Sequence, residues 1–426
     1  MTEDFLHYLW QNKLFTDTLT TTLGEQIEII HTGYHNFNAG PDFSDARLVI
    51  SKTKWAGNIE IHLNASDWFK HGHQHDEAYN NVVLHVVYNN DLKEHMSGMP
   101  VCELKGKINL KLYEAYESFL CKQEFVPCFN DLTTISEIDL TLWLERMLIE
   151  KLQSKSDFIN DALKRSQNDW GEAFYQVLVR SFGFKVNSLP FEMLSRTLPL
   201  RILAKHSDSL FQTEALLFGQ AGLLSQELLD PYSQSLFNEY VFLRKKYQLA
   251  PISKSLWKFL RMRPVNFPTI RLAQLAAVVH STSGNLFEII SLPSVDKMLD
   301  LFDVTTSDYW HTHYVFDVES PSKSGHLGLK ASYLLIINAV LPFMFVYGSS
   351  CGNDDLCHKA LSFLDQIPGE ENSVISKWKE AGIHAPTASK SQALMELKFS
   401  YCDNKKCLQC RIGNLIIRNP EFLNTV

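Results

Sequence analysis

Residues 57–63 have the sequence GNIEIHL, and polar and apolar side chains alternate strictly from Asn58 to Leu63. A β-strand directs every second side chain to the same face of its sheet. We therefore expect Glu60 and His62 to share one face, with the intervening apolar side chains on the other face, in the core. The stretch predicts a strand that carries a carboxylate beside an imidazole.

The segments around this strand predict a compact αβ unit. Helix-like spacing of apolar residues predicts a helix over residues 3–15, and a second, short helix is expected over 67–70. Strands are expected over residues 27–31, 46–50, 55–63 and 82–88, with a further strand in 102–110. The turn-forming loop 32–44 contains Asp42, which we expect near the end of the strand that carries Glu60.

The remainder of the chain has mainly helical patterns. The 426 residues predict two or three domains, and we expect an α/β domain over 1–125, a helical domain over 126–320 and a helical region over 321–426. The fold class expected is α+β, with the αβ unit followed by a large, mainly helical part. A linker is expected at residues 320–325, which are rich in serine.

Charge and hydropathy predict a soluble, cytoplasmic protein without a membrane span. The net charge is −8, the first residues are acidic rather than signal-like, and the eight cysteines suggest reduced thiols. The longest apolar run, residues 331–347, is shorter than the ~20 residues of a spanning helix. We expect a buried helix there that ends or kinks at Pro342.

Asp42 and Glu60 are the predicted ligands of a divalent cation. Mg²⁺ and Mn²⁺ take oxygen ligands, and such an ion lowers the pKa of a bound water and stabilises charge on a phosphoryl oxygen. His62, two residues beyond Glu60 on the same strand face, can position the attacking water. The three residues predict a catalytic site for phosphodiester hydrolysis.

Pro41-Asp42 followed by Glu60-Ile61-His62 resembles the PD-(D/E)XK motif of restriction-endonuclease-like nucleases. The expected order of elements is similar to the αβββαβ core of that superfamily, and the resemblance covers roughly residues 1–90. It implies that Asp42 and Glu60 bind metal and that His62 takes the place of the motif's lysine. Glu3 lies on the helix where some members carry an additional acid.

The whole chain also resembles an uncharacterised bacterial family, known as a domain of unknown function, from which no activity can be transferred. The resemblance rests on the phrases GPDF at 40–43, GNIEIH at 57–62, LHVV at 84–87, YC at 401–402 and CLQC at 407–410.

A loop rich in histidine follows the short helix. His71, His73, His75 and Asp76 can bind Zn²⁺ or Mn²⁺, and a Zn²⁺-dependent enzyme built on His71, His73 and Asp76 is an alternative function. The loop can instead be a polar surface segment, or His71 or His73 can fold back over Glu60. His85 is expected to be a hydrogen-bonded, half-buried residue rather than a ligand.

Residues 241–272 contain no acidic residue and interleave cations with aromatic side chains. Such a pattern suits phosphate contact and base stacking, although a solvated helix face beside core aromatics has the same composition. The predicted nucleic-acid contacts are Arg244, Lys245, Lys246, Lys258, Arg261 and Arg263. A non-catalytic nucleic-acid-binding or scaffold protein is therefore the second alternative function.

Cys402, Cys407 and Cys410 have the spacing of a metal knuckle and predict a structural Zn²⁺ site. Three thiolates are one ligand short, and Cys351, Cys357 or His358 can supply the fourth. The alternative is a small turn with three reduced thiols.

Overall fold

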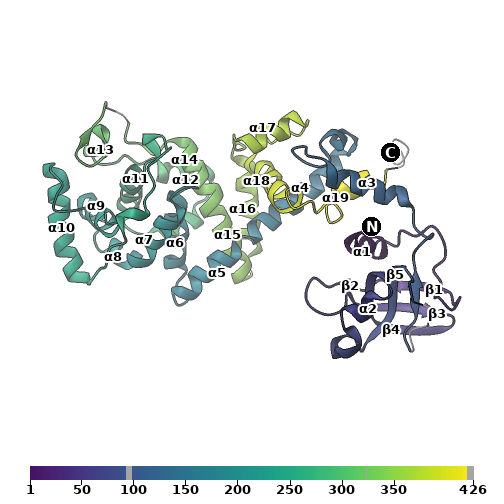
Figure 1. Cartoon of the computed structure of the whole chain (residues 1–426). Coiled ribbons are helices and arrows are strands. Elements are labelled where there is room, and N and C mark those ends of the chain that lie inside the picture. The colour runs from purple at the N-terminus through teal and green to yellow at the C-terminus, as the bar shows by residue number, and fades with distance from the viewer. Residues whose placement is uncertain (93–97, 323, 420–426) are drawn as a thin grey trace. The chain divides into compact units, whose positions relative to one another are not determined.

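The computed structural model describes residues 1–92, 98–322 and 324–419 of the chain (Figure 1). They form two compact units, of which the first contains residues 1–143 together with the segment from Lys398 onward. The second unit is Leu144–Leu397. The predicted α+β class is confirmed, because the first unit holds a mixed sheet and the second is mainly helical.

The sheet of the first unit has the strand order β1-β3-β4-β5-β6, with the short β2 paired to β3. The neighbours β1, β3 and β4 are antiparallel, whereas β5 runs parallel to both β4 and β6. The strands are β1 Ile27–His31, β2 Tyr34–His35, β3 Phe43–Ile50, β4 Thr53–Asn64, β5 Val82–Asn89 and β6 Val101–Glu103. The parallel β4–β5 pair is connected through a helical segment, as parallel strands require.

The central strand β4 has the alternation that the sequence predicts, but both of its faces are covered. Ile59 and Ile61 are buried in the core, and Glu60 and His62 on the opposite face are also almost completely buried. Helix α1 packs against β4, and α2 covers it as well. The polar face of β4 is therefore an enclosed site rather than a solvated surface.

The helices of the first unit are α1 Glu3–Gln11, α2 Asp67–Lys70, α3 Leu110–Cys121, the 3₁₀ turns η1 His73–His75, η2 Glu77–Tyr79 and η3 Phe129–Thr134, and α19 Arg411–Ile417. Helix α1 ends earlier than the predicted residue 15, because Lys13 adopts a left-handed conformation with φ of 51°. Strand β6 is shorter than the predicted 102–110, since Asn109 already caps α3.

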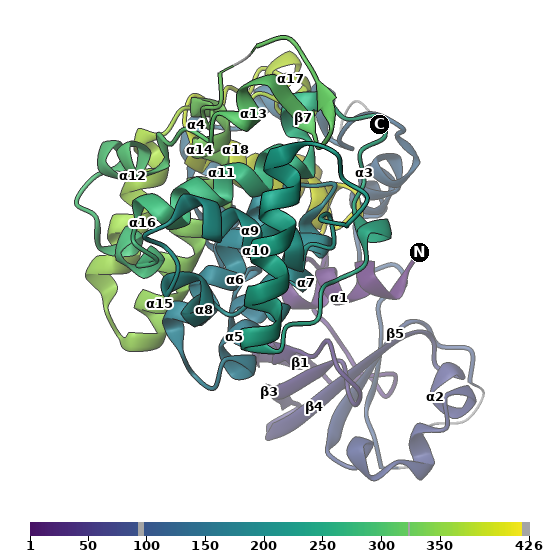
Figure 2. The same cartoon turned by 90° about the vertical axis from the view of Figure 1, so that its left-hand side faces the viewer.

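Helix α4 Glu137–Gln153 begins in the first unit and continues into the second. The other α-helices of the second unit are α5 Ser156–Arg165, α6 Trp170–Phe182, α7 Ser188–Thr197, α8 Leu200–Ala204, α9 Leu210–Gln220, α10 Pro231–Tyr247, α11 Pro268–Ser281, α12 Val295–Phe302, α13 Tyr309–Thr312, α14 Leu329–Leu335, α15 Leu341–Cys351, α16 Asp354–Gln366, α17 Ser373–Glu380 and α18 Ala388–Glu396. Single turns η4 Lys254–Leu256, η5 Pro264–Asn266 and η6 Leu286–Ser291, and the hairpin β7 His313–Val315 with β8 Val318–Glu319, complete it. Helix α9 packs against both α10 and α11 (Figure 2).

The sequence predicts a buried helix that ends or kinks at Pro342. The helix does not end there but continues to Cys351. A π-helical turn, η7 Ile336–Val340, joins α14 to α15, and the N–H of Leu341 bonds to the carbonyl of Ile336. This wider turn accommodates the proline, which has no N–H to donate. Among the described residues, Leu329–Cys351 is one helical run long and apolar enough to cross a membrane, and 61% of its apolar window is buried.

The two units differ from the three regions expected from sequence. The cysteine-bearing segment belongs to the first unit, because α19 packs against α3 and η3. The helices on both sides of the expected boundary at residue 320 belong to one unit. Both differences arise from packing between distant segments, which local sequence patterns do not record.

Candidate metal centre

Asp42 and Glu60 lie side by side because two hydrogen bonds fasten the chain before β3 to the middle of β4. The backbone N–H of Asp42 donates to Oε2 of Glu60 at 3.1 Å, and the N–H of Ile61 donates to Oδ2 of Asp42 at 2.8 Å. The structure thus brings together the two acids that the sequence analysis paired, although 18 residues separate them.

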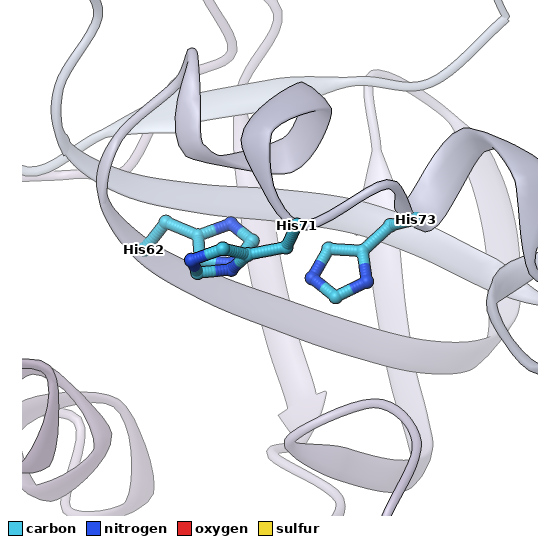
Figure 3. Close-up of side chains that lie close together, drawn as sticks. All are labelled: His62, His71 and His73. Carbon is cyan, nitrogen blue, oxygen red and sulfur yellow. The ribbon is translucent and has the colours of Figure 1, made fainter.

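Three imidazoles, those of His62, His71 and His73, lie close together (Figure 3). His62 comes from β4, whereas His71 and His73 come from the segment that follows α2. Nε2 of His62 and Nε2 of His73 each lie 3.4 Å from Oε1 of Glu60. Nδ1 of His71 lies 3.2 Å from Nε2 of His62.

These separations fit a tetrahedral metal ion. Zn²⁺ binds imidazole nitrogen and carboxylate oxygen at about 2.0–2.1 Å, which places two ligand atoms of a tetrahedron ~3.3 Å apart. The ligand atoms of His62, His71 and His73 all lie within 4.8 Å of one another. Among the described residues no other group of this kind is as closely gathered. An imidazole-rich set suits Zn²⁺ better than Mg²⁺, which prefers oxygen ligands.

Three buried nitrogen atoms at the site have no hydrogen-bond partner, and one of them is Nδ1 of His85. Nε2 of His73 faces Glu60, and Nε2 of His7 lies 3.2 Å from Oδ2 of Asp42, yet neither makes a hydrogen bond. A buried polar atom without a partner costs ~1–3 kcal/mol. A cation between the nitrogens of His7 and His73 and the carboxylates would satisfy them, so the residues fit a metal ion.

His85 fixes the orientation of the His62 ring. Its Nε2 lies 2.9 Å from Nδ1 of His62, so the other nitrogen of His62 faces Glu60. Histidines that bind metal commonly have their second nitrogen fixed by such a partner. His85 is hydrogen-bonded, as predicted, but it is fully rather than half-buried.

The pKa values of the two acids suit the binding of a cation. Burial, followed by the negative charge of Asp42, raises the pKa of Glu60 to about 8. Burial also acts to raise the pKa of Asp42, but the neighbouring His7 and the N–H of Ile61 outweigh it, and the net pKa is lowered. Asp42 is therefore ionised at neutral pH, whereas Glu60 becomes a carboxylate there only with added positive charge nearby.

His62 is not a substitute for a lysine cation. Burial, and then the neighbouring His71 and His73, lower its pKa to about 4. A neutral imidazole is the form that binds a metal ion. The position that the resemblance gave to a positively charged group is thus occupied by a potential ligand.

The two groups of possible metal ligands expected from sequence in this unit lie next to each other. His73 folds back beside Glu60, which was one of the three interpretations of the loop, and His71 lies against His62. Asp76 is not part of this group, because its Oδ1 accepts from the N–H of Ala78 at 2.9 Å and caps η2. The exposed His75 lies outside the group as well.

Helix α1 contributes His7, which the sequence motifs did not indicate, and Glu3, which the family resemblance had pointed to. His7 contacts Asp42, and the charge of Asp42 influences the pKa of Glu3, which burial raises. Glu3 and His7 are four residues apart and therefore share a helix face. That spacing of an acid and a histidine was the available signal. Tyr79 also belongs to the surroundings, because its ring stacks on His73 with centroids 3.9 Å apart.

The basic stretch 241–272 is divided between different surroundings. Arg244, Lys245 and Lys246 form the last turn of α10, where cations stabilise the helix end. Trp257 is buried, and its indole N–H donates to the carbonyl of Ala221, so it is not available for base stacking. The backbone of Lys258 bonds to Asn187.

The three cysteines of the C-terminal segment lie near a fourth. Buried Cys128, just before η3, influences the pKa of Cys402, which burial raises. The thiols of Cys407 and Cys410 have the same influence on Cys128. The alternatives expected from sequence, Cys351, Cys357 and His358, lie in or beside α15 and α16 of the second unit.

Cys410 immediately precedes α19. Burial raises the pKa of its thiol, although the backbone N–H groups of Gly413 and Ile412 at the start of α19 act to lower this pKa. Lys405 bonds to the carbonyl of Leu120, which ties the cysteine segment to the chain leading to Cys128. The thiols are less closely gathered than the three imidazoles.

Comparison with known proteins gives one match. Residues 3–373 match the family described as "Protein of unknown function (DUF2851)". No curated protein and no solved structure matches the chain. The matched region includes α1, the whole sheet and most of the helical unit, and it confirms the resemblance of the chain to an uncharacterised family. The chain therefore belongs to this family of proteins of unknown function, DUF2851.

Proposed function

We propose that the first unit is a metal-dependent hydrolase that cleaves phosphodiester bonds in nucleic acid. The observation that carries the proposal is the cluster of His62, His71 and His73, in which His62 and His73 each lie 3.4 Å from the Glu60 carboxylate. These four residues would hold the ion, and their imidazoles make Zn²⁺ or Mn²⁺ the preferred metal over Mg²⁺.

Such an ion, when bound, lowers the pKa of a water and stabilises charge on a phosphoryl oxygen. The residues of the chain supply the remainder of the chemistry. Asp42 stays ionised and retains 22% exposure of its side chain, so it can orient a water and accept its proton. His7 lies against the same carboxylate oxygen and limits its orientation.

The choice of a phosphodiester substrate is supported by the order of elements. With the two-residue β2 left aside, the order α1, β1, β3, β4, α2, β5 resembles the αβββαβ core of restriction-endonuclease-like nucleases. Asp42 and Glu60 occupy the positions of the two acids in that motif, at the start of one strand and within the next. The predicted cytoplasmic location is compatible with such a substrate.

Incubation of the full-length protein with labelled DNA and RNA, each single- and double-stranded, tests the proposal. Cleavage is expected with Zn²⁺ or Mn²⁺ and is expected to be abolished by EDTA. Glu60→Gln should reduce the rate at least ~100-fold, since it removes a ligand without changing side-chain volume. His75→Ala is the control and should cleave like the wild type.

Equal cleavage by Glu60→Gln and wild type, or none by either with any metal, would contradict the proposal. The second of these results would favour the non-catalytic nucleic-acid-binding protein. A specific observation supports that alternative, namely the carboxylate-free lining of a hollow in the second unit.

We also propose that Cys128, Cys402, Cys407 and Cys410 hold a structural Zn²⁺. Four thiolates complete the usual tetrahedral set, and the N–H groups at the start of α19 stabilise one of them. Binding of the ion would draw the four sulfurs to about 2.3 Å from it. Zinc analysis of the purified protein, and of its Cys128→Ser variant, tests this site.

A further inference from the structure

A hollow of about 1060 Å³ in the second unit is lined by cations and by no carboxylate residue. Its basic side chains are Lys185, Arg261, Arg263, Arg271 and Lys330, accompanied by His326. A lining of several cations without any acid is unusual in a chain whose net charge is −8. Lysines and arginines that gather without acids create a positive potential that attracts anions.

Some of these basic side chains have an ionic partner and others do not, and His326 lies 3.4 Å from the carboxylate of Asp303. Lys330 pairs with Glu371 at 2.7 Å. Among the described residues, Lys185, Arg261 and Arg263 form no ion pair. Arg261 and Arg263 are also exposed at the rim, where their side chains are free to reach a bound molecule.

Arg271 is the most informative residue of the hollow. It is only 8% exposed, and its guanidinium lies 4.4 Å from the ring centre of Phe184. Its two terminal nitrogens donate to neutral amides, to Gln274 at 2.8 Å and to Asn266 at 2.7 Å. Nε of Arg271 is buried and has no hydrogen-bond partner.

A buried guanidinium without a carboxylate is costly for the fold. Burial lowers the pKa of Arg271 to about 10, and no opposing acid contributes. A charge removed from water normally requires a counter-charge, and the structure provides only amides. An anion that enters the hollow would supply both the missing charge and an acceptor for the free N–H.

The cationic lining continues into a second hollow, which shares Phe184, Lys185 and Leu334 with the first. It adds Lys155 and Arg180, and again no carboxylate residue lines it. Arg180 pairs with Glu192 behind the surface. Burial, and then the charges of Lys151 and Arg180, lower the pKa of Lys155, while the nearby acids Glu396 and Glu370 act in the opposite direction.

We propose that these two hollows form one groove that binds the phosphodiester backbone of a nucleic acid. A row of cations across two adjoining hollows fits an extended polyanion better than a single phosphate. Arginine is well suited to this contact because its planar group donates two parallel bonds to a phosphate. The proposal shares its substrate class with the proposed hydrolase, but binding in this groove requires no metal ion.

The affinity of the full-length protein for a labelled single-stranded 20-nucleotide oligomer, measured by fluorescence anisotropy in EDTA, tests the groove. Arg261→Glu with Arg263→Glu reverses two exposed charges and should weaken binding at least ~30-fold. The slope of log affinity against log salt should become shallower by about 1.4, since each lost phosphate contact to a single strand contributes ~0.7. Arg271→Gln should also weaken binding, and its melting curve reports whether it folds.

Lys245→Glu with Lys246→Glu is the matched control, because it changes the net charge equally on the exposed end of α10, outside the residues that line the groove. Its affinity should change less than threefold. Equal weakening by both pairs, or by neither, would overturn the groove, as would equal affinity for inorganic phosphate and the oligomer. Glu60→Gln should bind like the wild type, so loss of cleavage and loss of binding are separable.

Discussion

His73→Ala should weaken Zn²⁺ binding by the first unit at least ~100-fold, whereas His75→Ala should leave it unchanged. Nε2 of His73 is a buried atom without a hydrogen bond, 3.4 Å from Oε1 of Glu60. Alanine removes this ligand and leaves the carboxylate with one neighbouring imidazole fewer. Loss of a residue that only supports a ligand already costs 10–100-fold in metal affinity, so loss of a ligand should cost at least as much.

The two histidines make a closely matched pair. They lie in the same turn, two residues apart, and only His73 faces the Glu60 carboxylate. Titration calorimetry of each variant against Zn²⁺ in the presence of a competing chelator measures the difference. Equal affinity in both variants would mean that the imidazole cluster does not bind the ion.

Cys128→Ser should remove about one equivalent of zinc from the purified protein and destabilise the first unit by ~3 kcal/mol or more. Cys128 lies 274 positions before Cys402 in the sequence, yet it is grouped with the three later cysteines in the structure. An ion held by all four joins the end of the chain to the segment before η3. Without it, α19 depends on apolar packing and on polar contacts such as the ion pair between Arg411 and Asp139.

Cys121→Ser is the control, because this cysteine is exposed at the end of α3. It should retain zinc and melt like the wild type, while Cys128→Ser should melt ~10 °C lower. Zinc content is measured by mass spectrometry and melting by calorimetry. A Cys128→Ser protein with full zinc content and an unchanged melting temperature would rule out this ligand.

Much of the sheet and the pairing of Asp42 with Glu60 were predictable from local patterns. The alternation over residues 58–63 identifies β4, because side chains alternate with a period of two along any strand. The turn at 40–41 places Asp42 at the start of β3, and the short connection then returns the chain to β4. These features depend on residues that are close in sequence.

Other parts of the site depend on contacts that no local pattern contains. His7 reaches Asp42 from a helix that precedes the sheet, and Cys128 meets cysteines near the end of the chain. Local patterns also could not predict the basic groove, because its lining comes from several separate helices and loops. The acid-free stretch 241–272 in the sequence identified Arg261 and Arg263, but it grouped them with Lys245, which lies on α10.

Burial also changed the expected chemistry of individual residues. Glu60 and His62 were expected on a polar strand face, but α1 and the segment after α2 enclose them. In this enclosed position the pKa of His62 falls to about 4, mainly through desolvation. The residue type alone does not indicate whether an imidazole acts as a cation or as a ligand, because its surroundings decide the pKa.

Anomalous X-ray scattering from crystals of the zinc-loaded protein would locate the ion directly. We predict a peak about 2.0–2.2 Å from Oε1 of Glu60 and from the facing nitrogens of His62 and His73. This peak should be absent from crystals of the Glu60→Gln variant. Loaded crystals with ordered side chains at these residues and no peak between them would contradict the metal centre.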